Sequence, residues 1–133
     1  MANILLQRGL QQDVDVTYKL AGESTAVDLT TGGFDAELVI RKKRGDSYQG
    51  QLIDVLRQGD TSGDGVSEAD NRILFVDPAV GGNNIVLKWN TTQATRLPNE
   101  AVTVYGDLKI TNSSNEVAHH IRLTFDILPE ITA

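Results

Sequence analysis

The stretch "VAHHIRLTFDI", residues 117–127, indicates the fold of this chain more clearly than any other. Large apolar side chains recur at every second position in it: Ile121, Leu123, Phe125 and Ile127, with Val117 in step. Successive side chains of a β-strand point to opposite faces of its sheet, so this alternation predicts a half-buried strand. We therefore expect Phe125 to lie in the core.

The same alternation recurs in "DVDVTYKL" (13–20), "FDAELVIR" (34–41) and "NIVLKW" (84–89), where Trp89 falls on the apolar face. Two other runs, "QLIDVLR" (51–57) and "NRILFV" (71–76), are more continuously apolar. A strand that is covered on both faces has this composition, so we expect two fully buried strands here.

Clusters of glycine, asparagine, serine and threonine separate these runs at short intervals, as turns do. The single helix candidate is "TTQATRLP" (91–98), in which a threonine would cap about two turns before Pro98 ends them. This pattern predicts an all-β fold, an antiparallel β-sandwich of the immunoglobulin-like kind with at most one short helix.

Length and composition restrict the function. The chain has 133 residues, which suits one domain spanning residues 1–133. It has no cysteine, which excludes disulfides, zinc–thiolate sites and thiol nucleophiles. The formal net charge of −6 disfavours binding to a phosphate backbone, so no nucleic-acid partner is expected. Its apolar runs are too short for a membrane span, so we expect no membrane partner and synthesis in the cytoplasm.

The segment "QGDTSGDGVSEAD" (58–70) resembles half of a calcium-binding loop. An EF-hand loop lies between two helices and closes with an acidic residue at its twelfth position. Counted from Asp60, that position is Asn71, and the flanking runs are typical of strands. We therefore expect a polar hairpin loop and no metal, with Asp60, Asp64 and Asp70 as weak calcium candidates.

Signatures of catalysis are absent from the sequence. It contains no nucleophile elbow and no glycine loop of the kind that holds phosphate groups. Its two histidines, His119 and His120, are adjacent, and neighbours in a strand face opposite ways, so they are badly placed to bind one metal. We expect His119 to be hydrogen-bonded at the core or its rim and His120 to face water. No catalytic residue and no cofactor is expected.

Four motifs follow one another in an informative order: "STAVDLTTGGFDAELVIR" (24–41), "NIVLKWNTTQATRLP" (84–98), "VYGDLKI" (104–110) and "VAHHIRLTFDILPEIT" (117–132). In this order they resemble small β-sandwich proteins of phage tails and baseplates, in particular the N-terminal domain of baseplate upper proteins. One departure is Gly106, which separates the tyrosine and the aspartate of the third motif. That departure predicts a β-bulge at Gly106.

This resemblance implies a non-enzymatic structural protein of a phage virion, made in the host cytoplasm. Such a protein is a tail, baseplate or neck adaptor that bridges other virion proteins, for example the tail core and receptor-binding fibres, and is oligomeric within the particle. An alternative remains open: a carbohydrate- or calcium-binding β-sandwich module displayed on a surface.

The beginning of the chain, "MANILLQRG" (1–9), contains three adjacent apolar residues, Ile4, Leu5 and Leu6. They cannot all face one core from a single strand, because successive side chains alternate. Either both faces are covered within the subunit, or a neighbour covers one of them. We therefore expect Ile4, Leu5 and Leu6 to lie at or near a subunit contact, with residues 1–9 as an interaction arm.

Overall fold

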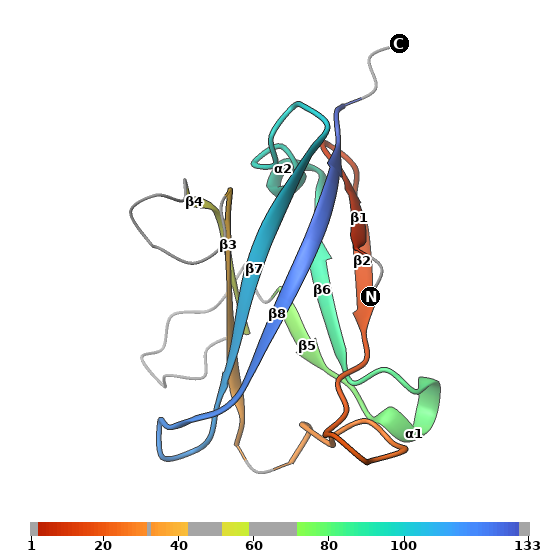
Figure 1. Ribbon diagram of the computed structural model, residues 1–133, viewed down its shortest axis with the longest axis vertical. Helices are drawn as coiled ribbons and strands as arrows, with labels where there is room; N and C mark the ends of the chain where they lie inside the picture. Colours follow the sequence, from red (N-terminus) through yellow and green to blue (C-terminus); the bar gives the residue numbers. More distant parts are fainter. Residues whose placement is uncertain (1–2, 32, 43–51, 59–71, 131–133) are drawn as a thin grey trace.

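The computed structural model describes residues 3–31, 33–42, 52–58 and 72–130, whose strands form two sheets (Figure 1). The five-stranded sheet has the order β1 (Ile4–Gln7), β8 (Val117–Leu128), β7 (Val102–Thr111), β3 (Asp35–Arg41) and β4 (Leu52–Arg57). The three-stranded sheet has the order β2 (Gln12–Val16), β6 (Ile85–Trp89) and β5 (Ile73–Phe75). The predicted all-β class is confirmed.

One strand pair departs from the predicted antiparallel arrangement. β1 runs parallel to β8, with Ile4 opposite Phe125 and Gln7 opposite Leu128, while the other pairs are antiparallel. A parallel neighbour needs a crossover between the two strands, and here the rest of the chain separates β1 from β8. Alternation in the sequence indicates which face a residue occupies, but not the direction of its neighbour. The immunoglobulin-like assignment stays a prediction.

The core is built from the inward faces of both sheets, whose buried residues form one hydrophobic cluster. Phe125 of β8 is fully buried, as predicted, and Trp89 of β6 lies beside it. Their ring centroids are 6.2 Å apart at an interplanar angle of 73°, the edge-to-face arrangement that aromatic pairs favour. This contact joins the two sheets near the centre of the core.

The predicted bulge at Gly106 is wrong. Tyr105, Gly106 and Asp107 pair in unbroken register with Thr124, Leu123 and Arg122 of β8, and the irregularity lies between Ile110 and Thr111. Gly106 faces the core, where an added Cβ would lie 2.9 Å from both Leu38 Cδ1 and Phe125 Cε2. The glycine therefore makes room for the ring of Phe125 and leaves the strand regular.

The two runs expected to be buried on both faces are edge strands instead. β4 ends the five-stranded sheet and β5 ends the three-stranded one, and each has half-buried or exposed residues besides its buried ones. β4 and β5 belong to different sheets and therefore are not the two arms of a hairpin, which corrects that part of the loop prediction. Asp60, Asp64 and Asp70 themselves lie outside the described residues.

The predicted helix is present as one turn, α2 (Thr91–Ala94). Its cap is Asn90, not a threonine: the Asn90 side chain accepts from the Gln93 N–H, and the Gln93 side chain accepts from the Asn90 N–H. This reciprocal capping box satisfies two backbone donors that a free helix end leaves unpaired. A second turn, α1 (Pro78–Gly81), was not predicted, and is capped by Asp77.

The segment between β2 and β3 is attached to the smaller sheet by one buried amide, that of Asn84. Its Oδ1 accepts a hydrogen bond from the Tyr18 N–H, and its Nδ2 donates to the carbonyl oxygens of Tyr18 and Val27. Further along, the Thr30 hydroxyl and N–H donate to the Asp28 carboxylate, which lowers the pKa of that exposed group. Side chains therefore satisfy the backbone where no strand does so.

Candidate interaction surface

The N-terminal strand β1 separates its apolar residues between the two faces of the sheet. Leu6 is fully buried and Ile4 is half-buried, and both belong to or pack against the core. Leu5 points the other way and is 62% exposed. Only the inner face of this strand is therefore covered by the described residues of the subunit, and Leu5 is the residue available to a neighbour.

A second exposed leucine lies near Leu5. β1 pairs with β8 so that Leu5 is opposite Asp126 and Gln7 is opposite Leu128, which places Leu5 and Leu128 diagonally on the outer face. Asp126 between them accepts hydrogen bonds from the Asn3 amide and the Thr103 hydroxyl. The result is a small apolar pair beside a polar group at the end of the larger sheet.

The free edge of β1 is partly blocked by a side chain of the same subunit. The Gln12 amide donates to the Gln7 carbonyl oxygen at 2.8 Å and accepts from the Gln7 N–H at 3.0 Å. Both backbone groups of Gln7 thus have the partners that a neighbouring strand would supply. Another strand cannot easily add at this end of β1.

β8 has a longer edge without a strand partner in the described part of the chain. β1 covers only Phe125–Leu128, so residues 117–123 have β7 on one side and no described strand on the other (Figure 1). β2 is likewise an edge, since it pairs with β6 alone among the described strands. Two strand edges of different sheets are therefore open on one side of the molecule.

A groove of about 730 Å³ lies between these two edges. Its apolar lining comes from β1, β2, β8 and the segment that follows β2: Ile4, Val16, Tyr18, Ile121 and Leu123. Charged and polar side chains complete the lining, among them Asp15, Lys19, His120 and Arg122. The groove thus combines an apolar floor with unpaired strand edges, which is the combination that binds an added strand.

His119 lies beside this groove and contacts Tyr18, in the segment that follows β2. Its Nδ1 lies 3.1 Å from the Tyr18 hydroxyl, and the two rings meet edge to face with centroids 5.2 Å apart. Phe34 adds a third ring, 6.0 Å from that of His119. His119 is half-buried and His120 is exposed, as the sequence predicted.

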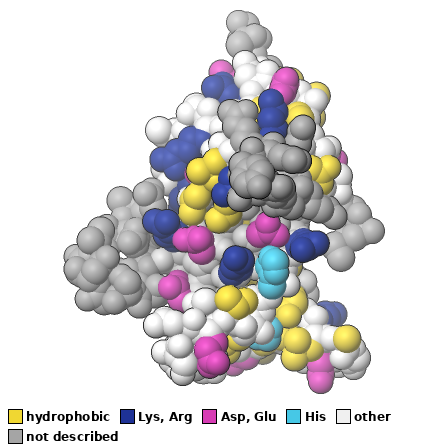
Figure 2. Space-filling view, turned by 60° about the vertical axis from the view of Figure 1, so that its left-hand side comes forward, with side chains coloured by type: hydrophobic (Ala, Val, Ile, Leu, Met, Phe, Trp, Pro, Cys, Tyr) yellow, Lys and Arg dark blue, Asp and Glu magenta, His cyan; other side chains and the backbone are white. Residues whose placement is uncertain are grey.

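The outer face of the larger sheet carries charges of both signs. Figure 2 shows basic and acidic side chains mixed across one side of the molecule, with histidine among them. Asp107 accepts from His120 at 3.2 Å and lies 3.9 Å from Arg122, and Glu37 pairs with Arg57 at 3.0 Å. Pairs of exposed charges contribute little to stability, so this face is a solvated one.

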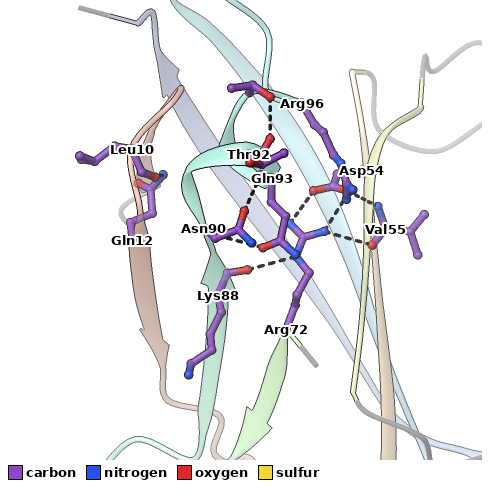
Figure 3. Close-up of polar contacts among 11 residues, drawn as sticks. Leu10, Gln12, Asp54, Val55, Arg72, Lys88, Asn90, Thr92, Gln93 and Arg96 are labelled. Carbon is purple, nitrogen blue, oxygen red and sulfur yellow. Dashed lines mark hydrogen bonds and ion pairs between the residues drawn. The ribbon is translucent and has the colours of Figure 1, made fainter. Parts of the chain in front are cut away.

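The structure contains a buried ion network that the sequence did not predict (Figure 3). Arg72, which precedes β5, reaches across to Asp54 of β4 and binds both carboxylate oxygens, at 3.1 and 2.6 Å. Both side chains are only 3% exposed, and Arg96 adds a contact to Asp54 at 3.3 Å. The Arg72 Nε donates to the Lys88 carbonyl oxygen, and its guanidinium lies 5.8 Å from the Trp89 ring centroid. This network joins the edge strands of the two sheets.

The charges of this network have partners, and a small pocket lies beside it. The pocket, of about 240 Å³, is lined by Arg72, Lys88, Trp89 and Gln93 among others. The buried Trp89 Nε1 has no hydrogen-bond partner among the described residues. The Asp54 carboxylate balances the Arg72 charge, which a buried charge requires.

Among the described residues, no group of three or more histidine, aspartate or glutamate side chains is placed to hold a metal ion. The same described part of the chain contains no helix that is long and apolar enough to cross a membrane. No protein-family model matches this chain, and a search of curated proteins finds no relative.

Proposed function

We propose that this protein is a non-enzymatic structural subunit of a phage virion, an adaptor at the tail, baseplate or neck that bridges other virion proteins. The order of its four motifs supports this assignment, because that order resembles small tail and baseplate β-sandwich proteins. The strand order β2-β6-β5 and β8-β7-β3-β4 is also the order of the B-E-D and G-F-C-C′ strands in immunoglobulin-like domains, which supports the finer fold assignment.

The observation that carries the proposal is the exposure of Leu5 on an edge strand. Leu5 is 62% exposed and lies next to exposed Leu128, so a partner that covers it lowers the free energy of the complex. Covering one leucine contributes about 1.5–3 kcal/mol, enough to change an association constant by roughly tenfold or more. An adaptor works through such contacts, so β1 is its proposed contact with a neighbour.

Leu5→Gln tests this proposal, with Leu52→Gln as a matched control. Leu52 is 51% exposed on β4, at the opposite edge of the same sheet, so the two substitutions carry the same chemical change. The neutral amide places no new charge opposite Asp126, the partner of Leu5, or opposite Arg41, the partner of Leu52. Both variants should unfold at nearly the same urea concentration as the wild type. Quantitative mass spectrometry of purified virions should find the amount of Leu5→Gln in the particles reduced about tenfold and that of Leu52→Gln unchanged.

Two results would count against the proposal in different ways. Normal incorporation of Leu5→Gln would show that β1 is not the contact. Absence of the wild-type protein from purified particles would refute the virion assignment itself.

A further inference from the structure

We infer that two copies of this chain associate through their open edges, with β2 of each copy beside β8 of the other. This inference goes beyond the virion assignment and does not require it, because it concerns the purified protein in solution. It rests on the groove between β2 and β8, on the strand edges that border it, and on the charges that those edges carry.

The first observation is the position of the two edges. Residues 117–123 of β8 have no described strand on one side, and β2 pairs with β6 alone in the described part of the chain. Both edges border one groove, so a partner seated there meets both at once. The alternative edge at β1 is blocked at Gln7 by the Gln12 amide, which directs association to the groove.

The second observation is the apolar lining. Ile121 and Leu123 of β8 and Val16 of β2 face the groove together with Tyr18. Ile121 and Tyr18 are only half-buried, so they still expose surface to solvent. When two grooves meet, these residues pack against their counterparts, and an added strand can satisfy the backbone groups along both edges.

The third observation selects the occupant. The charged outward-facing residues of β2 are Asp13 and Asp15, both exposed, whereas the outward-facing residues of open β8 include the basic His120 and Arg122, also exposed. Pairing β8 with β8 would place basic groups opposite each other, and pairing β2 with β2 would do the same with carboxylates. Opposite like charges destabilise a sheet, so only pairing of β2 with β8 is complementary.

Two neighbouring charges modify this complementarity without reversing it. Asp107 lies beside His120 and Arg122, but its contact with Arg122 is long, at 3.9 Å, and the Arg122 side chain is 67% exposed. The Arg122 guanidinium can therefore bind a second carboxylate. Lys19 also lines the groove, but it lies beyond the end of β2 and outside the strand pairing, and it is exposed.

A second copy satisfies both edges because of symmetry. In a two-fold dimer each contact occurs twice, so the β2 edge of one copy meets β8 of the other while its own β8 meets the second β2. A single chain thus carries both halves of the complementary surface.

Sedimentation equilibrium of the purified wild-type protein, Asp15→Arg, Arg122→Glu and the double variant tests the inference. Each single reversal should raise the dimer dissociation constant about tenfold or more, because it creates like-charge contacts twice per dimer. The double variant should return to within about threefold of the wild type, since it restores opposite charges. Arg57→Glu on β4 is the matched control, an exposed arginine reversed at the other edge, and it should leave the constant unchanged.

A wild-type protein that remains monomeric up to about 1 mM would overturn the inference. So would single reversals without effect, or a double variant that stays as weak as the singles. Hydrogen exchange of the wild type checks the interface without any substitution: amides of residues 13–17 and 117–123 should gain protection as protein concentration rises. Concentration-dependent protection at β4 instead would assign the interface to another edge.

Discussion

Replacement of Asp54 by alanine should destabilise the protein more than the loss of any exposed ion pair. Asp54 binds both Nη atoms of Arg72, and both side chains are 3% exposed. Without the carboxylate, the Arg72 charge remains buried, and its hydrogen-bond partners in the described part of the chain are the carbonyl oxygens of Lys88 and Val55. Removing one partner of a buried pair costs about 3–5 kcal/mol. Arg96 is 47% exposed and can turn toward water when Asp54 is absent, so it does not reduce this cost.

The assay is urea unfolding followed by fluorescence of Trp89, the only tryptophan of the chain, with a double-mutant cycle. Asp54→Leu combined with Arg72→Met should recover most of the loss, because two apolar side chains leave no buried charge. Asp107→Ala is the matched control: Asp107 also has two basic neighbours, but its side chain is 45% exposed. It should cost about 0–1 kcal/mol.

A loss below about 1 kcal/mol for Asp54→Ala would refute this reasoning, since it would mean that water reaches Arg72. A double variant as unstable as the single one would refute the claim that the uncompensated charge is the cause.

Three further substitutions probe the core by the same unfolding assay. Phe125→Ala removes a fully buried ring that contacts Trp89, and should cost about 3–5 kcal/mol; a loss below about 1 kcal/mol would mean that the ring is not in the core. Gly106→Ala should cost about 1–3 kcal/mol through contact with the Phe125 ring, and combining it with Phe125→Leu should cost less than the sum of the two changes. Asn84→Ala leaves the Tyr18 N–H and carbonyl groups without their amide partner and should cost at least about 1–3 kcal/mol; an unchanged unfolding midpoint would contradict that role.

The period-two pattern was sufficient to place most strands and the central core residue. Ile121, Leu123, Phe125 and Ile127 occupy one face of β8 as their alternation predicts, because that face must be buried whatever strand lies next to it. The pattern does not identify neighbours. The parallel pairing of β1, the unbroken register at Gly106 and the separation of β4 from β5 depend on contacts between distant segments.

The buried ion pair could have been suspected from one signal. Asp54 shares its parity with buried Leu56 in an apolar run, which places a carboxylate on the inner face of a strand. Its partner could not be identified, because Arg72 lies 18 residues further along and precedes a different strand. The groove could not be predicted either, since it exists only where β1 is too short to cover all of β8.

The sequence predicted one subunit contact for Ile4, Leu5 and Leu6, but the structure places these residues differently. Leu6 belongs to the core, so deletion of residues 2–8 would remove core packing as well as any contact. Leu5 alone is exposed without a structural role in the described subunit. Single substitution at Leu5 is therefore a cleaner probe of assembly than truncation.

The central claim is that this chain acts as a structural part of a virion. Quantitative mass spectrometry of highly purified particles tests it most directly, with the known tail proteins as internal standards. We expect the protein to remain with the particles through density-gradient purification, at a fixed number of copies per particle. A protein that is abundant in infected cells but absent from the purified particles would contradict it.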